Sequence, residues 1–179
     1  MNTKKDEFHY KSLLVTSRFL IRDLTEFDAN EVYLNWLSDS VAVKFIEGTK
    51  HTHNLEGLKS YINEKTMLND VRFFGIFDKI TNVHIGNIKY EPINLIYSYA
   101  VMGVLIGDKN WRGKGVFSEV FSATSQHLAE CYGLKKIYLG VSSEHMHAIK
   151  SYKKSGFVFV NNHPLGDSRS GFVMVFEGL

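Results

Sequence analysis

A short glycine-rich stretch is the part of this sequence whose residue types are best suited to chemistry. Residues 107–119 read Gly-Asp-Lys-Asn-Trp-Arg-Gly-Lys-Gly-Val-Phe-Ser-Glu and directly follow the apolar run 104–106. We therefore expect a strand, a loop and the start of a helix in that order. The first N–H groups of a helix lack carbonyl partners and lie at the positive end of the helix dipole, so this arrangement can bind an anion.

Glycine and positive charge at this turn favour a phosphate as the anion. Gly113 and Gly115 let the backbone approach a ligand closely, and Arg112 and Lys114 add charge beside it. The same residues would also suit a tight turn that binds nothing. A Walker loop is excluded, because Gly-Lys is not followed by Ser or Thr. A Rossmann fingerprint is disfavoured, because Ser118 stands where it needs a third Gly or Ala.

A second segment of the sequence is informative when it is read together with the loop. Residues 141–157 read Val-Ser-Ser-Glu-His-Met-His-Ala-Ile-Lys-Ser-Tyr-Lys-Lys-Ser-Gly-Phe. Together the two segments resemble the GNAT superfamily of N-acetyltransferases, whose loop reads Arg/Gln-x-x-Gly-x-Gly/Ala and whose later helix reads Asn-x-x-Ala-x-x-x-Tyr-x-Lys-x-Gly-Phe. The residues that match in identity and order are Arg112, Gly115, Ala148, Tyr152, Lys154, Gly156 and Phe157.

The N-terminal half resembles one branch of that superfamily more loosely. Residues 22–24, 33–37 and 58–62 are similar to ribosomal-protein N-terminal and amino-sugar N-acetyltransferases, so the resemblance runs from about Leu14 to Phe157. It implies an α/β (α+β) fold in which a mixed, mostly antiparallel sheet is flanked by helices. We expect one N-acetyltransferase domain over residues 1–179, with residues 1–11 flexible.

The resemblance also implies a co-substrate and a set of binding residues. Acetyl-CoA would be the acetyl donor, and a primary amine would attack it directly. Backbone groups at the end of the strand 104–106 would hold the pantetheine arm and the thioester carbonyl. The residues expected to bind acetyl-CoA are Leu105, Ile106, Gly107, Arg112, Gly113, Lys114, Gly115, Val116, Phe117, His145 and Ala148.

Tyr152 is the candidate catalytic residue. A phenol can donate a proton to the departing thiolate as a general acid. The alternative is core packing, because Tyr152 shares an apolar face with Ala148 and Ile149. No general base stands out: Glu91, His84, Tyr97 and Tyr99 lie on predicted strands that could border the acceptor, and a chain of water molecules could serve instead.

Two residues depart from the family pattern. Phe117 stands where the loop motif ends in Gly or Ala, which would place a bulky group near the phosphates. His145 stands where the helix motif has Asn, although an imidazole can also donate one hydrogen bond. The sequences His51-Thr52-His53 and His145-Met146-His147 resemble fragments of a metal site. Neither has a carboxylate at ligand spacing, so we predict no metal.

Hydrophobic spacing predicts the elements that position these segments. A helix capped by Asp28 would present Val32, Leu34, Trp36 and Leu37 on its apolar face, and a second would start near Thr52–Asn54 and bury residues 55, 58, 61 and 62. A third, behind Gly115, would bury one stripe from Phe117 to Cys131 and end at Gly133, and a short one would follow from His145 to Ser155. Strands are expected at 13–22, 71–77, 83–90, 97–106, 136–141, 157–161 and 171–177, with 97–106 covered on both faces.

Composition limits the partners. With 21 basic and 19 acidic residues among 179, the formal charge of +2 gives no sign of a nucleic-acid or anionic-membrane partner. No apolar run approaches the ~18 residues of a membrane span. A single cysteine excludes an internal disulfide and agrees with a reducing compartment, so we expect a cytoplasmic protein. Whether it forms a homodimer is left open.

The acceptor amine is open within these limits. A nucleotide-linked amino sugar is the first expectation, because the N-terminal half resembles that branch. A protein N-terminus is the second. A non-catalytic acyl-CoA-binding module is the competing class, supported by the departures at Phe117 and His145 and opposed by the presence of Tyr152.

Overall fold

The computed structural model describes residues 12–38, 54–165 and 171–179. The expectations for residues 1–11 and for His51-Thr52-His53 lie outside these ranges. The strands are β1 (Leu13–Val15), β2 (Phe19–Asp23), β3 (Arg72–Asp78), β4 (His84–Asn94), β5 (Tyr99–Ile106), β6 (Lys136–Ser142), β7 (Val158–Phe159) and β8 (Gly171–Phe176). The α-helices are α1 (Glu31–Ser38), α3 (Leu55–Met67), α4 (Val116–Tyr132) and α5 (Met146–Lys154), with short 3-10 turns η2 (Glu26–Asp28) and η4 (Lys109–Trp111).

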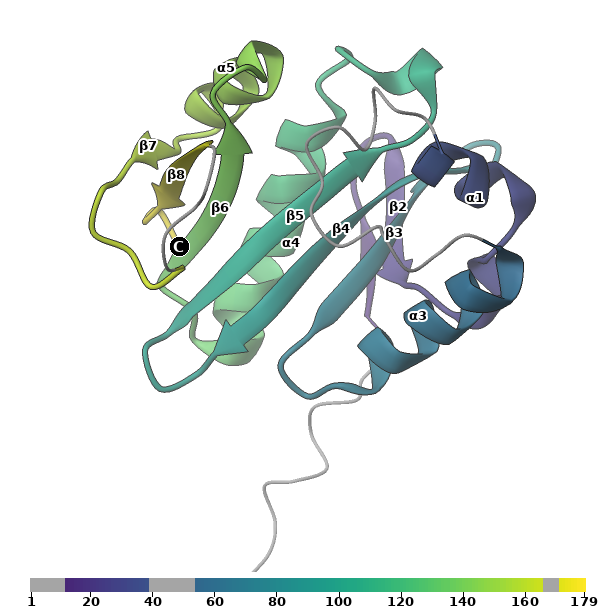
Figure 1. Ribbon diagram of the computed structural model, residues 1–179, viewed down its shortest axis with the longest axis horizontal. Coiled ribbons are helices and arrows are strands. Elements are labelled where there is room, and N and C mark those ends of the chain that lie inside the picture. The colour runs from purple at the N-terminus through teal and green to yellow at the C-terminus, as the bar shows by residue number, and fades with distance from the viewer. Residues whose placement is uncertain (1–11, 39–53, 166–170) are drawn as a thin grey trace, which may run out of the picture.

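One mixed sheet organises the described residues. Its eight strands follow the order β1-β2-β3-β4-β5-β6-β8-β7. All neighbours are antiparallel except β5 and β6, which run parallel because α4 connects them (Figure 1). The predicted fold class is therefore confirmed.

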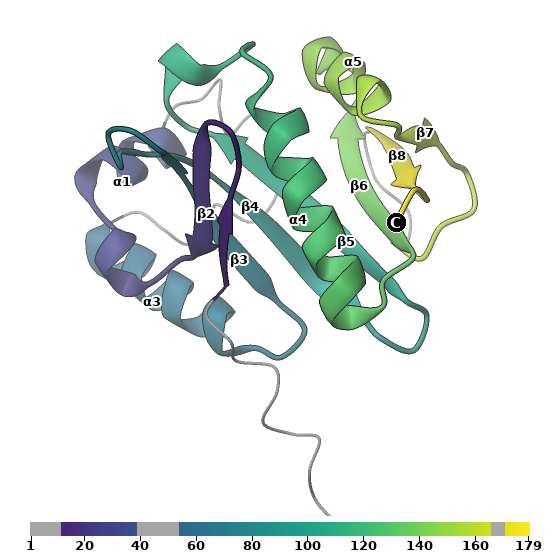
Figure 2. The ribbon, with the colours of Figure 1, turned by 180° about the vertical axis from the view of Figure 1, so that it is seen from behind.

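Helices cover the two faces of the sheet, with one large apolar core on each face. A third, small apolar cluster of Tyr138, Val173 and Val175 lies on β6 and β8. On the face seen in Figure 2, α4 lies across the sheet, and Val120, Phe121 and Leu128 pack on Phe74 and Ile88. On the opposite face, which we call the front face and which Figure 1 shows, α1 and α3 cover one side of the sheet. Alternation along β3 supplies both cores, since Phe74 belongs to the first and Phe73 to the second.

The front-face helices begin at residues that cap them. The Asn54 side chain accepts a hydrogen bond from the Gly57 N–H at 2.8 Å, which confirms the predicted start of α3. The predicted cap of α1 is wrong. Asn30 accepts from the Tyr33 N–H at 3.0 Å, whereas Asp28 ends η2 and binds Arg22 with both carboxylate oxygens.

The buried face of α1 also differs from the prediction. Tyr33 and Trp36 are buried, and Val32 is exposed. The two aromatic rings face the His84 side chain on β4, so packing between helix and sheet selects them. Leu34 and Leu37 are only partly buried at the edge of this contact.

Two strands differ from their predicted form. The strand β4 continues through Pro92, because a register shift between Tyr90 and Ile93 accommodates a residue that cannot donate to the ladder. The strand β5 is not covered on both faces, since Gly103 is exposed at its centre. That opening lies on the front face, beyond the cover of α1 and α3.

Cys131 lies on the surface, although the apolar stripe of α4 predicted it inside. Tyr132, four residues after Leu128, is half-buried in its place and packs against the core. The Cys131 Sγ lies 3.6 Å from Nδ1 of His127.

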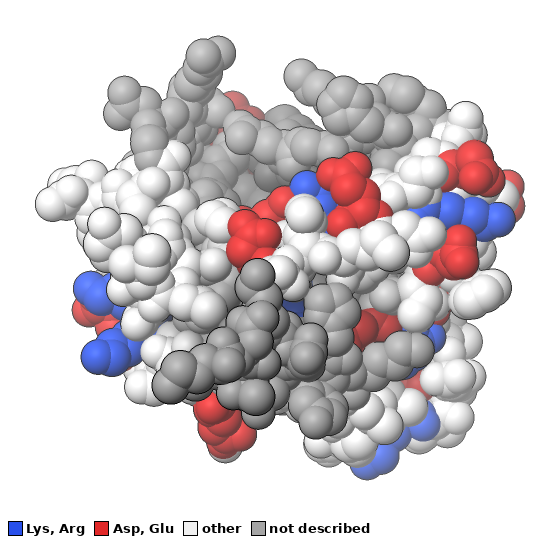
Figure 3. Space-filling view, turned by 90° about the horizontal axis from the view of Figure 1, so that it is seen from below, with Lys and Arg blue, Asp and Glu red and all other residues white. Residues whose placement is uncertain are grey.

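Charge is dispersed over the part of the surface that Figure 3 shows. Acidic and basic side chains are scattered among uncharged ones on this face, and neither sign gathers into a broad patch. Among the described helices, none combines the length and the apolar character that crossing a bilayer requires.

Candidate functional site

The strands β5 and β6 separate in the middle of the sheet. They are paired only where Tyr99–Val101 faces Lys136–Tyr138, although β5 continues to Ile106 and β6 to Ser142. Figure 1 shows them diverging toward the loop before α4 and toward α5. Backbone groups of β5 beyond Val101 that face β6 thus have no strand partner, and such groups are suited to binding a ligand.

Alternation along β5 determines which backbone groups face the separation. The Gly107 N–H donates to the Ile85 carbonyl on β4 at 3.0 Å. Successive peptide groups of a strand point to opposite sides, so the N–H groups of Val104 and Ile106 face β6. Those of Leu105 face β4, and its side chain is buried in the front-face core. Of the predicted binding residues on β5, Ile106 borders the separation and Leu105 does not.

The loop after β5 leads into the first turn of α4, whose backbone N–H groups have no carbonyl partner within the helix. The first hydrogen bond of α4 runs from the Glu119 N–H to the Gly115 carbonyl at 3.4 Å, so the N–H groups of residues 116–118 precede any helical carbonyl partner. Gly115 caps the helix in the left-handed region, at φ 73°, and Gly113 has the same φ. A side chain at either position would be strained, which explains both glycines.

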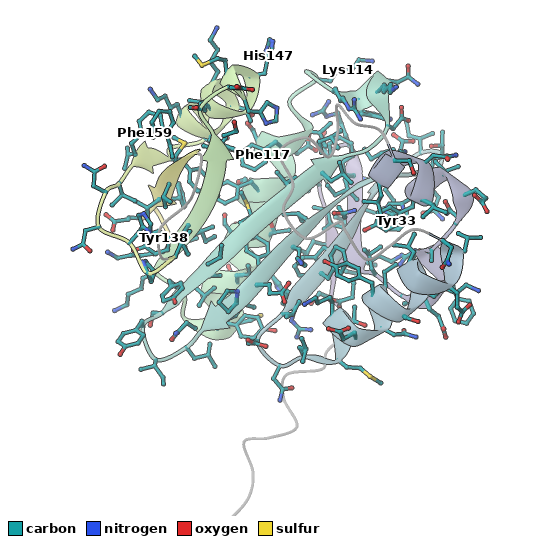
Figure 4. The ribbon with its side chains drawn as sticks, in the orientation of Figure 1. Tyr33, Lys114, Phe117, Tyr138, His147 and Phe159 are labelled. Atoms are coloured by element: carbon teal, nitrogen blue, oxygen red, sulfur yellow. The ribbon has the colours of Figure 1, made fainter. Side chains whose placement is uncertain are left out.

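The two predicted cationic side chains of the loop are placed differently. Arg112 turns back toward β5, where its Nε donates to the Ile106 carbonyl at 2.9 Å and its Nη2 to the Gly107 carbonyl at 3.0 Å. It therefore holds the loop against the strand. Lys114 is exposed, and Figure 4 shows it on the loop at the upper edge of the molecule.

Arg18 and Glu119 support the loop from a distant part of the sequence. Glu119 accepts hydrogen bonds from the Thr16 hydroxyl at 2.7 Å, the Arg18 N–H at 2.8 Å and the Arg18 Nε at 2.7 Å. The Arg18 Nη1 in turn donates to the Lys114 carbonyl at 3.0 Å. Burial alone would raise the pKa of Glu119, but these donors outweigh it and lower the pKa. No local signal indicates this contact, because the two residues are 101 positions apart.

The Phe117 ring lies in the core rather than near the loop. Its side chain is 7% exposed, stacks on Phe121 and meets Tyr152 edge to face at 4.9 Å. The expectation of a bulky group beside the phosphates is therefore wrong: the side chain points inward while its backbone N–H lies at the helix start. Val116, 2% exposed, is buried in the same way.

Tyr152 packs in the core and keeps a hydroxyl that is not used in a hydrogen bond to the described residues. Its ring packs against Phe117 and Phe157. Its hydroxyl has no hydrogen-bond partner among the residues that the structure describes, and burial raises the pKa of Tyr152 to about 12. The phenol is consequently protonated at neutral pH and has a proton to donate.

The start of α5 supplies the remaining predicted residues. His145 precedes the helix, is half-buried, and its N–H donates to the Ser142 carbonyl at 3.0 Å. Burial, then the neighbouring His147, lowers the pKa of His145. Ala148 packs against the core, and His147 is exposed at the upper edge of Figure 4. In the described ranges, no three His, Cys, Asp or Glu side chains are grouped to hold a metal ion.

Three of the four candidate bases, Glu91, Tyr97 and Tyr99, lie in surroundings that do not favour proton abstraction. Glu91 binds Lys65 at 2.6 Å and Lys89 at 2.5 Å, and these lysines lower its pKa although burial alone would raise it. Tyr97 is exposed in the β4–β5 turn, and Tyr99 packs edge to face on Tyr138 at 5.6 Å. None of the three is placed as a strong base.

His84 is the remaining candidate and lies in an aromatic cluster. Its ring stacks on Phe77 at 4.7 Å and meets Trp36 at 5.0 Å, and burial lowers its pKa to about 4. The cluster borders an open pocket of about 470 Å³ lined by Val32, Asn35, Trp36, Val83, His84, Gly107, Asp108, Lys109 and Asn110. Gly107 is required here, because a Cβ would lie 1.9 Å from the Trp36 ring.

Comparison with known proteins identifies the family. The model of the acetyltransferase (GNAT) domain matches residues 18–158, which include the separated strands, the loop and all of α5 with Tyr152. The chain belongs to this family of acetyltransferase domains.

One curated relative matches part of this chain in sequence. A probable spermine N(1)-acetyltransferase of Bacillus subtilis subsp. natto is 44% identical over 52 residues, which are 29% of this chain and 34% of that protein. The matched stretch thus spans about a third of the curated relative.

Two solved structures share the fold at low sequence identity. A ribosomal L7/L12 alpha-N-protein acetyltransferase in complex with coenzyme A has a TM-score of 0.79 at 13% identity, covering 93% of this chain and 98% of that one. The spermidine N-acetyltransferase of Vibrio cholerae in complex with CoA and spermine has a TM-score of 0.75 at 22% identity, covering 89% and 95%.

Proposed function

We propose that this protein transfers the acetyl group of acetyl-CoA to a primary amine. The observation that carries the proposal is the separation of β5 and β6 beside a helix start with unpartnered N–H groups, within a domain of the GNAT family. A coenzyme A phosphate would bind the N–H groups of residues 116–118, with Lys114 beside them. The pantetheine arm would follow β5 along Val104 and Ile106.

The protein's own groups then have defined roles in acetyl transfer. An N–H of β5 that faces β6 donates to the thioester oxygen as the amine nitrogen attacks the carbonyl carbon. A C–N bond forms, the C–S bond breaks, and Tyr152 donates to the departing sulfur. Since the pKa of Tyr152 lies above that of a thiol, its hydroxyl stabilises the thiolate by a hydrogen bond before any complete proton transfer. The amine proton leaves to water, because no strong base is placed to take it among the residues that the structure describes.

The acceptor that we propose first is a nucleotide-linked amino sugar, and a protein N-terminus is the second choice. Both offer an amine that loses its proton near neutral pH, which suits a site whose described residues include no strong base. A polyamine is the rival, and the match to a spermine acetyltransferase over 52 residues favours it.

One assay tests the proposal. The protein is mixed with acetyl-CoA and a panel containing glucosamine, a UDP-linked amino sugar, an N-terminal peptide, lysine and spermidine, and free thiol is followed. We expect release with at least one amine, rising with pH and levelling off between about 7 and 8.5. A thermal shift with acetyl-CoA but no thiol release would support a non-catalytic acyl-CoA-binding module instead.

A further inference from the structure

A strip of polar side chains lies on the front face of β4. Asn87, Lys89 and Glu91 occupy alternate positions of the strand, so they point to the same face, and the intervening Ile88 and Tyr90 point into the core beneath α4. Lys89 is paired in register with Gly103 of β5. The strip therefore runs beside β5 where that strand leaves β6.

Two lysines share one carboxylate on this strip. The Lys89 Nζ lies 2.5 Å from Glu91 Oε2 and donates to the Tyr61 hydroxyl at 2.8 Å. The Lys65 Nζ, from α3, lies 2.6 Å from Glu91 Oε1. On the strip itself the Glu91 carboxylate thus serves two ammonium groups. A second carboxylate, that of the largely exposed Glu64, lies 3.9 Å from the Lys65 Nζ at the outer side of α3. The side chains of Lys65, Lys89 and Glu91 are 19–25% exposed and can be reached from solvent.

The front face of the sheet next to the lysines includes two positions without side chains. Gly103 of β5 and Gly140 of β6 both face the front, and a Cβ added to either would meet nothing within 4 Å. A bound molecule can therefore lie against the backbone between Lys89 and β6. Gly103 precedes Val104, whose N–H faces the proposed thioester site, so a molecule lying here has its reactive end beside that site.

Asn87 is a second sign of a ligand on the same strip. Its side chain is 7% exposed, and its Nδ2 is a buried donor without a hydrogen-bond partner. A buried donor left without a hydrogen-bond partner destabilises the folded protein. An acceptor oxygen of a ligand would remove that destabilisation.

We propose, on the basis of the proposed acetyl transfer, that the acceptor amine carries a phosphate or carboxylate group, and that Lys89 and Lys65 bind this group beside Gly103. The anion shares the two ammonium groups with Glu91, and the Asn87 amide donates to a neighbouring oxygen of the same molecule. A polycation finds the opposite environment, because the carboxylate of the cluster is already paired and the lysines repel it.

The test compares three amino sugars that differ in the presence and kind of an anionic group, together with one polycationic amine. Thiol release from acetyl-CoA is measured with glucosamine, glucosamine 6-phosphate, the uronic acid of glucosamine, and spermidine. We expect kcat/KM for at least one anionic amino sugar to exceed that for glucosamine by about 10- to 100-fold, as a charge-assisted bond gives. The phosphate and carboxylate arms show which anion fits. A preference for glucosamine or spermidine overturns the inference, while thiol release with these amines keeps the proposed function.

Two variants with opposite expected effects on acceptor preference extend the test. K89M removes one ammonium group and should lower the ratio of anionic to neutral kcat/KM about tenfold. E91Q frees the lysines and should raise that ratio, whereas it would lower turnover of a polycation that depends on the carboxylate. K135M changes an exposed lysine after α4 and should leave the ratio unchanged. Thermal unfolding confirms that each variant is folded, and an unchanged ratio in K89M contradicts the inference.

Discussion

The two halves of the candidate site differ in the groups that they present to a ligand. The cofactor side, from the end of β5 to the start of α4, presents mainly backbone groups: the N–H groups of residues 116–118 and of Val104 and Ile106. The proposed acceptor side, on the front face, presents side chains from separate elements, with Lys65 on α3 and both Lys89 and Glu91 on β4. A backbone site needs particular conformations, so it leaves a motif of glycines. A side-chain site needs only that a few residues meet in space, so its pattern in the sequence is weak.

The largest expected effect concerns the cofactor side. G115V places a β-branched side chain at φ 73° and fills the space that a phosphate would occupy, so acetyl-CoA should no longer raise the melting temperature. G133V is the matched control, because Gly133 ends the same helix at φ 63° with open space around it. Both variants should lose about 1–2 kcal/mol of stability, but only G115V should lose the acetyl-CoA response. An equal response in both would place the cofactor elsewhere.

The next effect concerns acetyl transfer itself, which would take place between the two halves. Y152F removes the hydroxyl and keeps the ring that packs on Phe117, so kcat should fall by about 10²- to 10⁴-fold with acetyl-CoA affinity nearly unchanged. Y132F, at the far end of α4, is the control and should retain kcat. Full turnover by Y152F would assign Tyr152 to packing alone.

A third effect is a pH dependence of stability on the acceptor side. Burial lowers the pKa of His84 from 6.5 to about 4, so between these values the unfolded chain binds a proton that the folded one does not. Stability is then complete above pH 6.5 and falls by roughly 3 kcal/mol as the pH drops to 4. H84F should reduce this slope, as measured by chemical denaturation across the range. Y33F alters the same aromatic cluster without a titrating imidazole and should keep it; equal slopes in all three proteins would contradict the role of His84.

The smallest effect concerns the support of the loop. E119Q weakens the bonds to Arg18, so KM for acetyl-CoA should rise about 3- to 10-fold with little change in kcat. Because the folded pKa of Glu119 is lowered, its stabilisation is present above its unfolded value near 4.5 and lost as the pH falls through the folded pKa. E130Q, on an exposed position of the same helix, should change neither KM nor acid stability. If both variants behave alike, the Arg18–Glu119 contact does not position the loop.

Patterns within single elements allowed much of the fold to be predicted. The starts of α3 and α4, the end of α4 at Gly133 and the separate strands follow from caps, glycines and hydrophobic periods, which act within a few residues. Where neighbours decided the outcome, the predictions failed. Asp28 binds Arg22 instead of capping α1, and Cys131 is exposed because Tyr132 takes the inward place at the end of α4.

The sequence by itself determined the family, the order of the elements and the position of the loop at Gly113 and Gly115, because a backbone that must adopt a left-handed conformation restricts the residues that can occupy it. Only the tertiary structure decided which charges meet: Arg112 turns onto the carbonyls of β5, and Arg18 supports the loop in its place. Lys65 and Glu91, 26 positions apart, form the cluster with Lys89. Long charged side chains can serve on almost any exposed face, so their partners are fixed only when the strands and helices are packed together.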